Sequence, residues 1–146
     1  ALARGEDVLT GRHGNTHIPL AVGAARRYEL TGDERYRKIC EFFWDRVVLD
    51  RTFATGGSTN GEIWGEPRKL AGTLSSTNHE TCKTYNMLRL TRHLLAWTGD
   101  VRYADYLERA FLNGILGTQE PEGGMLEYYV PLLRDPEPLR ARCAGS

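Results

Sequence analysis

A helix–turn–helix joint occurs twice in the chain, and it limits the possible folds more than any other feature of the sequence. The first copy covers residues 28–36 and the second covers residues 95–103, and both carry Thr-Gly-Asp at the same place. The glycine suits the left-handed conformation that ends one helix, and the aspartate suits the N-cap of the next helix. Two similar helical hairpins predict a repeating α-hairpin architecture, such as an α/α toroid or a solenoid.

Hydrophobic periodicity predicts four helices around these joints, because apolar residues recur at the i, i+3, i+4, i+7 spacing of one buried stripe. The predicted helices cover about residues 17–30, 34–49, 79–97 and 101–117. Their stripes assign Tyr85 and Phe111 to the core. Residues 125–130 predict a short strand, and the prolines that follow exclude further regular structure.

Charge and cysteine content narrow the classes of function. Nineteen basic residues balance nineteen acidic ones, which argues against a nucleic-acid binder and against a polybasic membrane-surface protein. No apolar run approaches the roughly 18 residues of a membrane helix, so we expect no membrane partner. Cys40, Cys82 and Cys143 match no disulfide framework and no paired zinc knuckle. Sparse, odd cysteine favours a reducing compartment, and we expect a cytoplasmic protein.

The segment between the two hairpins, residues 52–78, contains five glycines and shows no helical period. A loop of this length in a compact helical protein is usually either functional or disordered. Glu62 lies in this loop beside Trp64, where desolvation would raise the pKa of its carboxyl and make it a general acid. The alternative is a solvated loop glutamate, which the residues alone favour.

Glu80 and Cys82 lie at the start of the third predicted helix, and carboxylate and thiolate are both zinc ligands. Residues i and i+2 of a helix point about 200° apart, so the two can share a metal only where the chain departs from helical geometry. The alternative is a capping box formed by Thr77 and Glu80, which the residues alone favour. His13 lies in the polar turn before the first helix. It either faces a ligand or has a structural role in which its ring forms hydrogen bonds within the turn.

Several blocks of the sequence together resemble the β-L-arabinofuranosidase family of glycoside hydrolases. The blocks are residues 13–19 (His-Gly-Asn-Thr-His-Ile-Pro), 23–33, 42–45, 55–57, 80–82 (Glu-Thr-Cys), 84–88 and 103–106. The resemblance spans about residues 11–132 and is specific, because the blocks occur in the family's order.

The family's catalytic domain is a six-hairpin α/α toroid followed by β-sandwich domains, so the resemblance implies that this chain is a middle slice of the toroid. We therefore expect an all-α fold of helical hairpins with a long glycine-rich loop and a short C-terminal strand. Residues 1–133 would form this partial catalytic domain, and residues 134–146 would be an irregular, divergent or truncated tail.

The resemblance also implies a retaining mechanism on L-arabinofuranoside-containing glycans. In such enzymes one glutamate and three cysteines hold a zinc ion, and one of these cysteines attacks the anomeric carbon as a thiolate. By that pattern Glu80 and Cys82 are the first two ligands, Glu62 is the general acid/base, and His13 lines the sugar pocket.

The tail departs from the family pattern, in which the last two ligands are adjacent cysteines. Here Cys143 resembles the second of them, and Arg142 occupies the place of the nucleophile. Alternatively, the tail is unrelated to the family because of a frameshift or a truncation. In either case the nucleophile is missing, and we expect the chain to be inactive alone.

Two other classes of function compete with a glycosidase. A non-catalytic helical-repeat binding module accounts for the two joints but not for the glycine-rich loop, and a small structural-zinc protein lacks the four ligands it needs. The position of Glu62 discriminates among them. A hydrolase requires its carboxylate within roughly 10 Å of Glu80, in one pocket with His13.

Overall fold

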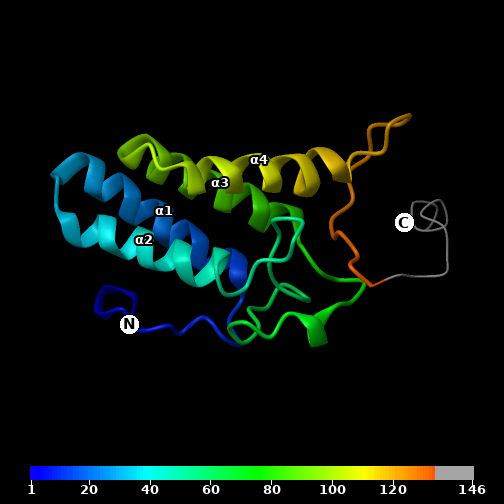
Figure 1. Cartoon of the computed structure of the whole chain (residues 1–146), viewed down its shortest axis with the longest axis horizontal. Helices are drawn as coiled ribbons and strands as arrows, with labels where there is room; N and C mark the ends of the chain where they lie inside the picture. Colours follow the sequence, from blue (N-terminus) through cyan, green and yellow to red (C-terminus); the bar gives the residue numbers. More distant parts are fainter. Residues whose placement is uncertain (134–146) are drawn as a thin grey trace.

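The computed structural model describes residues 1–133, and its four α-helices form two hairpins packed side by side (Figure 1). The helices are α1 (Gly14–Thr31), α2 (Glu34–Val48), α3 (Thr81–Thr98) and α4 (Val101–Gly114). Short 3-10 turns occur at η1 (Leu2–Arg4), η2 (Ala71–Thr73) and η3 (Leu116–Thr118). The predicted helical-hairpin class is confirmed. Residues 134–146, with Arg142 and Cys143, lie outside the described residues.

Both hairpin joints have the predicted caps. Gly32 and Gly99 end their helices in the left-handed conformation, with φ of 67° and 66°. The carboxylates of Asp33 and Asp100 then accept hydrogen bonds of 3.0 Å from backbone amides two residues later. The repeated sequence therefore produces the same turn twice.

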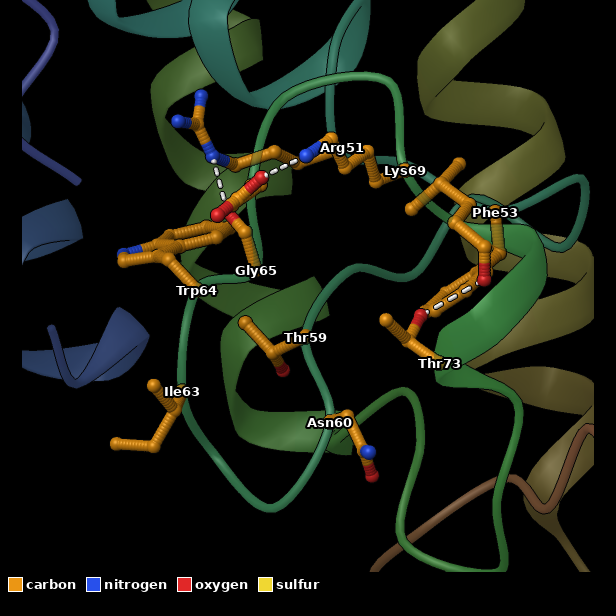
Figure 2. A pocket seen from close by; sticks show the side chains of 11 residues that line it. Arg51, Phe53, Thr59, Asn60, Ile63, Trp64, Gly65, Lys69 and Thr73 are labelled. Carbon is orange, nitrogen blue, oxygen red and sulfur yellow. Dashed lines mark hydrogen bonds and ion pairs between the residues drawn. The ribbon is translucent and has the colours of Figure 1, made fainter. Parts of the chain in front are cut away.

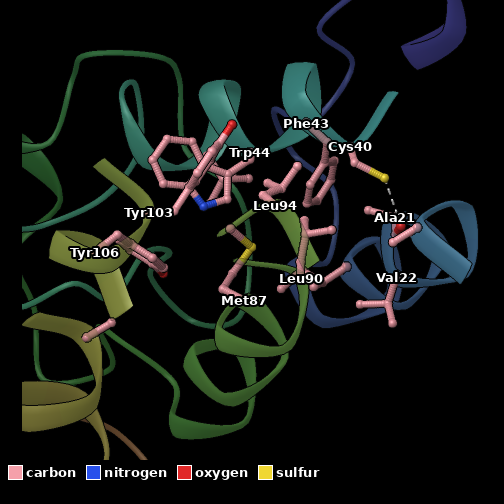
Figure 3. Packing of buried hydrophobic residues seen from close by; sticks show 14 of the residues in the cluster. Ala21, Val22, Cys40, Phe43, Trp44, Met87, Leu90, Leu94, Tyr103 and Tyr106 are labelled. Atoms are coloured by element: carbon pink, nitrogen blue, oxygen red, sulfur yellow. Dashed lines mark hydrogen bonds between the residues drawn. The ribbon is translucent and has the colours of Figure 1, made fainter. Parts of the chain in front are cut away.

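The core lies between the two hairpins, where α2, α3 and α4 share an aromatic cluster (Figure 3). The ring of Trp44 makes edge contacts with Tyr103 at 4.7 Å and with Tyr106 at 5.7 Å. Its indole nitrogen donates to Thr91 Oγ1 of α3 at 2.9 Å. Cys40 is buried in the same core.

Three details of the predicted elements are wrong. Tyr85 and Phe111 are 56% and 48% exposed, because the described residues place no further layer on those faces of α3 and α4. Residues 125–130 form no strand, since their backbone meets two different segments at isolated bridges, Gln119–Leu126 and Glu80–Tyr129. A strand needs one continuous partner, and the described part of the chain offers none to this segment.

Charged side chains fasten the glycine-rich loop to the end of α2. The buried carboxylate of Asp50 pairs with Arg46 at 2.7 Å and with Arg68 at 2.9 Å. Farther along the loop, Gly57 lies so close to the His79 ring that an added Cβ would be 1.9 Å from it. The loop is therefore held between the end of α2 and the start of α3. Over residues 1–133, each helix is too short or too polar to span a membrane.

Candidate active site

The glycine-rich loop brings Glu62 to the start of α1. Trp64 donates its backbone N–H to Arg12 O, and Gly14 donates to Glu62 O, both at 2.9 Å. These bonds place the Glu62 side chain beside His13, whose Nε2 donates to Glu62 Oε2 at 2.8 Å. The Glu62 carboxylate is therefore held by a side chain 49 residues away, although its side chain remains partly exposed to solvent.

At the start of α3 the chain departs from helical geometry, which Glu80 and Cys82 need if they are to bind the same metal ion. Glu80 is the N-cap residue with an extended backbone, and His79 before it has a φ of 54°. The side chains of Glu80 and Cys82 consequently meet, with the thiol directed at Glu80 Oε1. The buried carboxylate of Glu80 is only 2% exposed.

The capping box expected from Thr77 and Glu80 is absent from α3. No side chain caps this helix, and Thr77 Oγ1 instead donates to Asn60 Oδ1 at 2.9 Å. Thr77 therefore ties the approach to α3 to the glycine-rich loop. The Glu80 side chain is therefore available for the candidate site.

Two tyrosines that the sequence did not identify as site residues complete the arrangement. The hydroxyl of Tyr128 lies 3.0 Å from Glu62 Oε1 and 2.6 Å from Glu80 Oε1, and it donates to one of them at a time. Tyr129 donates to Glu62 Oε1 at 3.0 Å. One hydroxyl group thus separates the two carboxylates, which satisfies the limit of roughly 10 Å expected for a hydrolase.

Hydrogen bonds lower the pKa of Glu62 below its ordinary value, which corrects the expected rise. The main cause is the bond from His13, followed by those from Tyr128 and Tyr129. Desolvation by Trp64 does not prevail because the Glu62 side chain is 30% exposed. In contrast, burial and the neighbouring Glu80 raise the pKa of the Cys82 thiol to about 11.

Glu80 and Cys82 fit a cation as two of its ligands. Glu80 Oε2 is buried and accepts no hydrogen bond, while the ammonium group of Lys83 lies 3.4 Å away. The ion pair with Lys83 therefore compensates the charge of this buried oxygen, which still has a lone pair free for a metal ligand bond. Residues 1–133 contain no cluster of three or more His, Cys, Asp or Glu suited to a metal. Cys143, the third predicted ligand, lies outside the described residues.

A separate cavity of about 190 Å³ adjoins the glycine-rich loop (Figure 2). Arg51, Phe53 and Trp64 are among its lining residues, and the Arg51 guanidinium donates to Gly65 O at 2.9 Å. None of the predicted site residues lines this cavity. The candidate site instead lies where the loop meets the first turns of α1 and α3.

Comparison with known proteins matches the chain to one family. The family model described as β-L-arabinofuranosidase, GH127 catalytic domain, matches residues 1–144. No protein of curated function matches the sequence with significance.

Solved structures resemble the chain over most of its length. A GH127 β-arabinofuranosidase has a TM-score of 0.75 and 27% identity, over 85% of this chain and 20% of its own. A GH127 β-L-arabinofuranosidase from Geobacillus stearothermophilus T6 has a TM-score of 0.78 and 25% identity, over 97% of this chain and 22% of its own. A protein described as a glycoside hydrolase has a TM-score of 0.73 and 24% identity, over 89% of this chain and 25% of its own. The chain spans a fifth to a quarter of the length of these structures.

Proposed function

We propose, because this chain belongs to the family of GH127 β-L-arabinofuranosidase catalytic domains, that it supplies acid/base and metal-binding residues to a retaining glycoside hydrolase. Its substrates would be L-arabinofuranoside-containing glycans. The observation that carries the proposal is the meeting of Glu62, Glu80 and Cys82 around the hydroxyl of Tyr128. A helical-repeat binding module gives no reason for two carboxylates and a thiol to converge.

Glu80 and Cys82 would hold a zinc ion, with Cys143 as a further ligand in the proposal. When bound, zinc keeps a coordinated thiol deprotonated at neutral pH, which is the chemistry that a cysteine nucleophile needs. Burial and the neighbouring Glu80 raise the pKa of the Cys82 thiol to about 11, so without a bound cation the thiol keeps its proton at neutral pH.

Glu62 would hold the proton that the departing glycosidic oxygen takes, and would later remove a proton from water. Its pKa is lowered in the chain without substrate, so the carboxyl must gain its proton as the sugar binds. A sugar that excludes water and displaces the tyrosine hydroxyls would raise the pKa, because both changes disfavour the charged form. His13 would line the sugar pocket and orient the Glu62 carboxylate.

The nucleophile is the missing part of the proposed site. We propose that residues 1–133 are a partial toroid domain and that residues 134–146 are an irregular, divergent tail with Arg142 in the nucleophile's place. The chain alone would then be inactive. The free thiols of Cys40 and Cys82 suit a reducing compartment, and we keep the cytoplasm as the proposed location.

A chimera tests the proposed role of Glu62. Residues 1–133 replace the matching segment of the Geobacillus stearothermophilus relative, which supplies the rest of the chain. We expect the chimera to hydrolyse a chromogenic β-L-arabinofuranoside and Glu62→Gln to reduce the rate about 10²- to 10⁴-fold. Glu66→Gln, an exposed change in the same loop, is the matched control and should leave the rate unchanged. A folded chimera without activity would contradict the proposal, as would a chimera whose rate of hydrolysis is unchanged by Glu62→Gln.

A further inference from the structure

The amide side chain of Asn15 contacts the sulfur of Cys82. Asn15 lies in the first turn of α1, and its Nδ2 is 3.3 Å from Cys82 Sγ. Asn86, one turn beyond Cys82 on α3, donates its own Nδ2 to Asn15 Oδ1 at 2.8 Å. Because Asn86 occupies the carbonyl oxygen, the NH2 group of Asn15 is the end that faces the sulfur.

We propose that Asn15 is a positioning residue for Cys82, whose sulfur it holds in the pocket through an N–H···S hydrogen bond that Asn86 orients. The inference rests on the proposed function, in which Cys82 is a metal ligand. A metal-bound thiolate has no proton and can only accept a hydrogen bond. It therefore matches the donor end of the Asn15 amide and would be repelled by the carbonyl end.

Asn15 differs from the other groups around this sulfur because it is an N–H donor. Without a cation, the thiol points to Glu80 Oε1, and the Tyr128 hydroxyl lies 4.0 Å away. A cation in the place of the thiol proton would take both Glu80 and the sulfur as ligands. Among the described residues, Asn15 would then be the N–H donor that still contacts the sulfur. Metal ligands are commonly held in place by hydrogen bonds of this kind from neighbouring side chains.

The first turns of α1 and α3 approach each other closely next to Asn15. A Cβ added to Gly14, the preceding residue, would lie 2.8 Å from the side-chain carbons of Lys83. Lys83 is buried and donates to Thr59 Oγ1 at 2.5 Å. Gly14 thus permits the close approach that brings Asn15 to Cys82, the residue next to Lys83.

Cobalt(II) titration of the chimera described above tests the inference, because a thiolate ligand gives a sulfur-to-cobalt absorption band. We expect Asn15→Leu to weaken cobalt binding about 10- to 100-fold. The band should also move to longer wavelength, because a thiolate without the hydrogen bond is a stronger electron donor. Asn86→Asp should act in the same direction, since a carboxylate can only accept and would turn the Asn15 NH2 group towards itself. Asn113→Leu, an exposed asparagine on α4, is the control and should change neither.

A metal-free arm separates this inference from the zinc proposal. Unfolding is measured with a chelator present for Asn15→Leu, Cys82→Ala and the double variant, and non-additive changes in stability are expected for side chains in contact. Additive changes in the free energy of unfolding would overturn the inference. So would a cobalt affinity and an absorption band that Asn15→Leu leaves unchanged. If the chimera with Asn15 unchanged gives no cobalt band, the proposal that Glu80 and Cys82 bind zinc fails, and the unfolding cycle alone decides on Asn15.

Discussion

At the residue scale, the hydrogen bonds to Glu62 make the stability of the chain depend on pH. A carboxyl whose folded pKa is lowered stabilises the fold above its unfolded pKa, and that contribution is lost as the pH falls through the folded value. We expect Glu62→Gln to destabilise the chain at pH 7, and this difference to shrink as the pH falls below 4.5. Tyr129→Phe removes one donor and should move the transition closer to 4.5. Urea unfolding between pH 3 and pH 7 measures both, and a difference independent of pH would refute the prediction.

The sequence predicted some site residues and missed others for a physical reason. Glu62 and Glu80 were assigned to the candidate site through the family resemblance of the short segments in which they stand, whereas the residues alone favoured a solvated glutamate and a capping box. Tyr128 and Tyr129 reach Glu62 across 66 and 67 residues of chain, and Asn15 reaches Cys82 across 67. Such contacts depend on how the loop and the hairpins fold together, which no local pattern records. The same long-range bonds reverse the expected pKa shift of Glu62.

At the element scale, a left-handed glycine in a joint and a glycine inside a helix predict opposite effects of the same substitution by alanine. Gly99 has a φ of 66°, so Gly99→Ala should cost about 1–2 kcal/mol because a Cβ disfavours this conformation. Gly23 lies inside α1 with open space around it, and Gly23→Ala should stabilise the chain by about 0.5–1 kcal/mol. The two free energies of unfolding, compared in urea, check the prediction. A Gly99→Ala change that does not destabilise the chain would show that the joint does not depend on its glycine.

The hairpins were predictable because their signals are local. Gly32 and Asp33 specify a turn within a few residues, and the apolar stripes specify the faces that meet. The strand expected at residues 125–130 was not predictable in this way, since a strand exists only with a partner. Its backbone is divided between η3 and the start of α3.

At the scale of the whole molecule, exposed apolar side chains predict that the isolated chain is marginally stable. Leu30, Val101 and Leu20 are 76%, 69% and 67% exposed, and Tyr85 adds to the apolar surface of α3. Repeat proteins bury such faces against neighbouring hairpins, and uncapped ends associate or unfold readily. We expect a low melting temperature and concentration-dependent association in light scattering. A monodisperse monomer that melts cooperatively at high temperature would show that these faces need no further cover.

Metal binding and activity depend on parts of the site that come from different places in the chain. Glu80 and Cys82 supply two ligands, whereas protein zinc sites of the structural kind use four. Cys143 adds at most one more, and the positive charge of Arg142 next to it in the sequence opposes a cation at close range. We therefore expect the 146-residue chain to bind zinc weakly or not at all, as measured by competition with a chromogenic chelator.

Without a bound zinc ion, no thiolate stands ready for the anomeric carbon, because the Cys82 thiol keeps its proton at neutral pH. Glu62 alone cannot complete a double displacement, which needs a nucleophile as well as an acid. The isolated chain should therefore release no chromophore from a β-L-arabinofuranoside, even with zinc and a reductant present. Arg142→Cys restores adjacent cysteines and should strengthen zinc binding, while Arg140→Cys, two residues away, should not. Turnover by the unchanged chain that Glu62→Gln abolishes would mean that Cys82, Cys143 or water acts in place of the missing nucleophile.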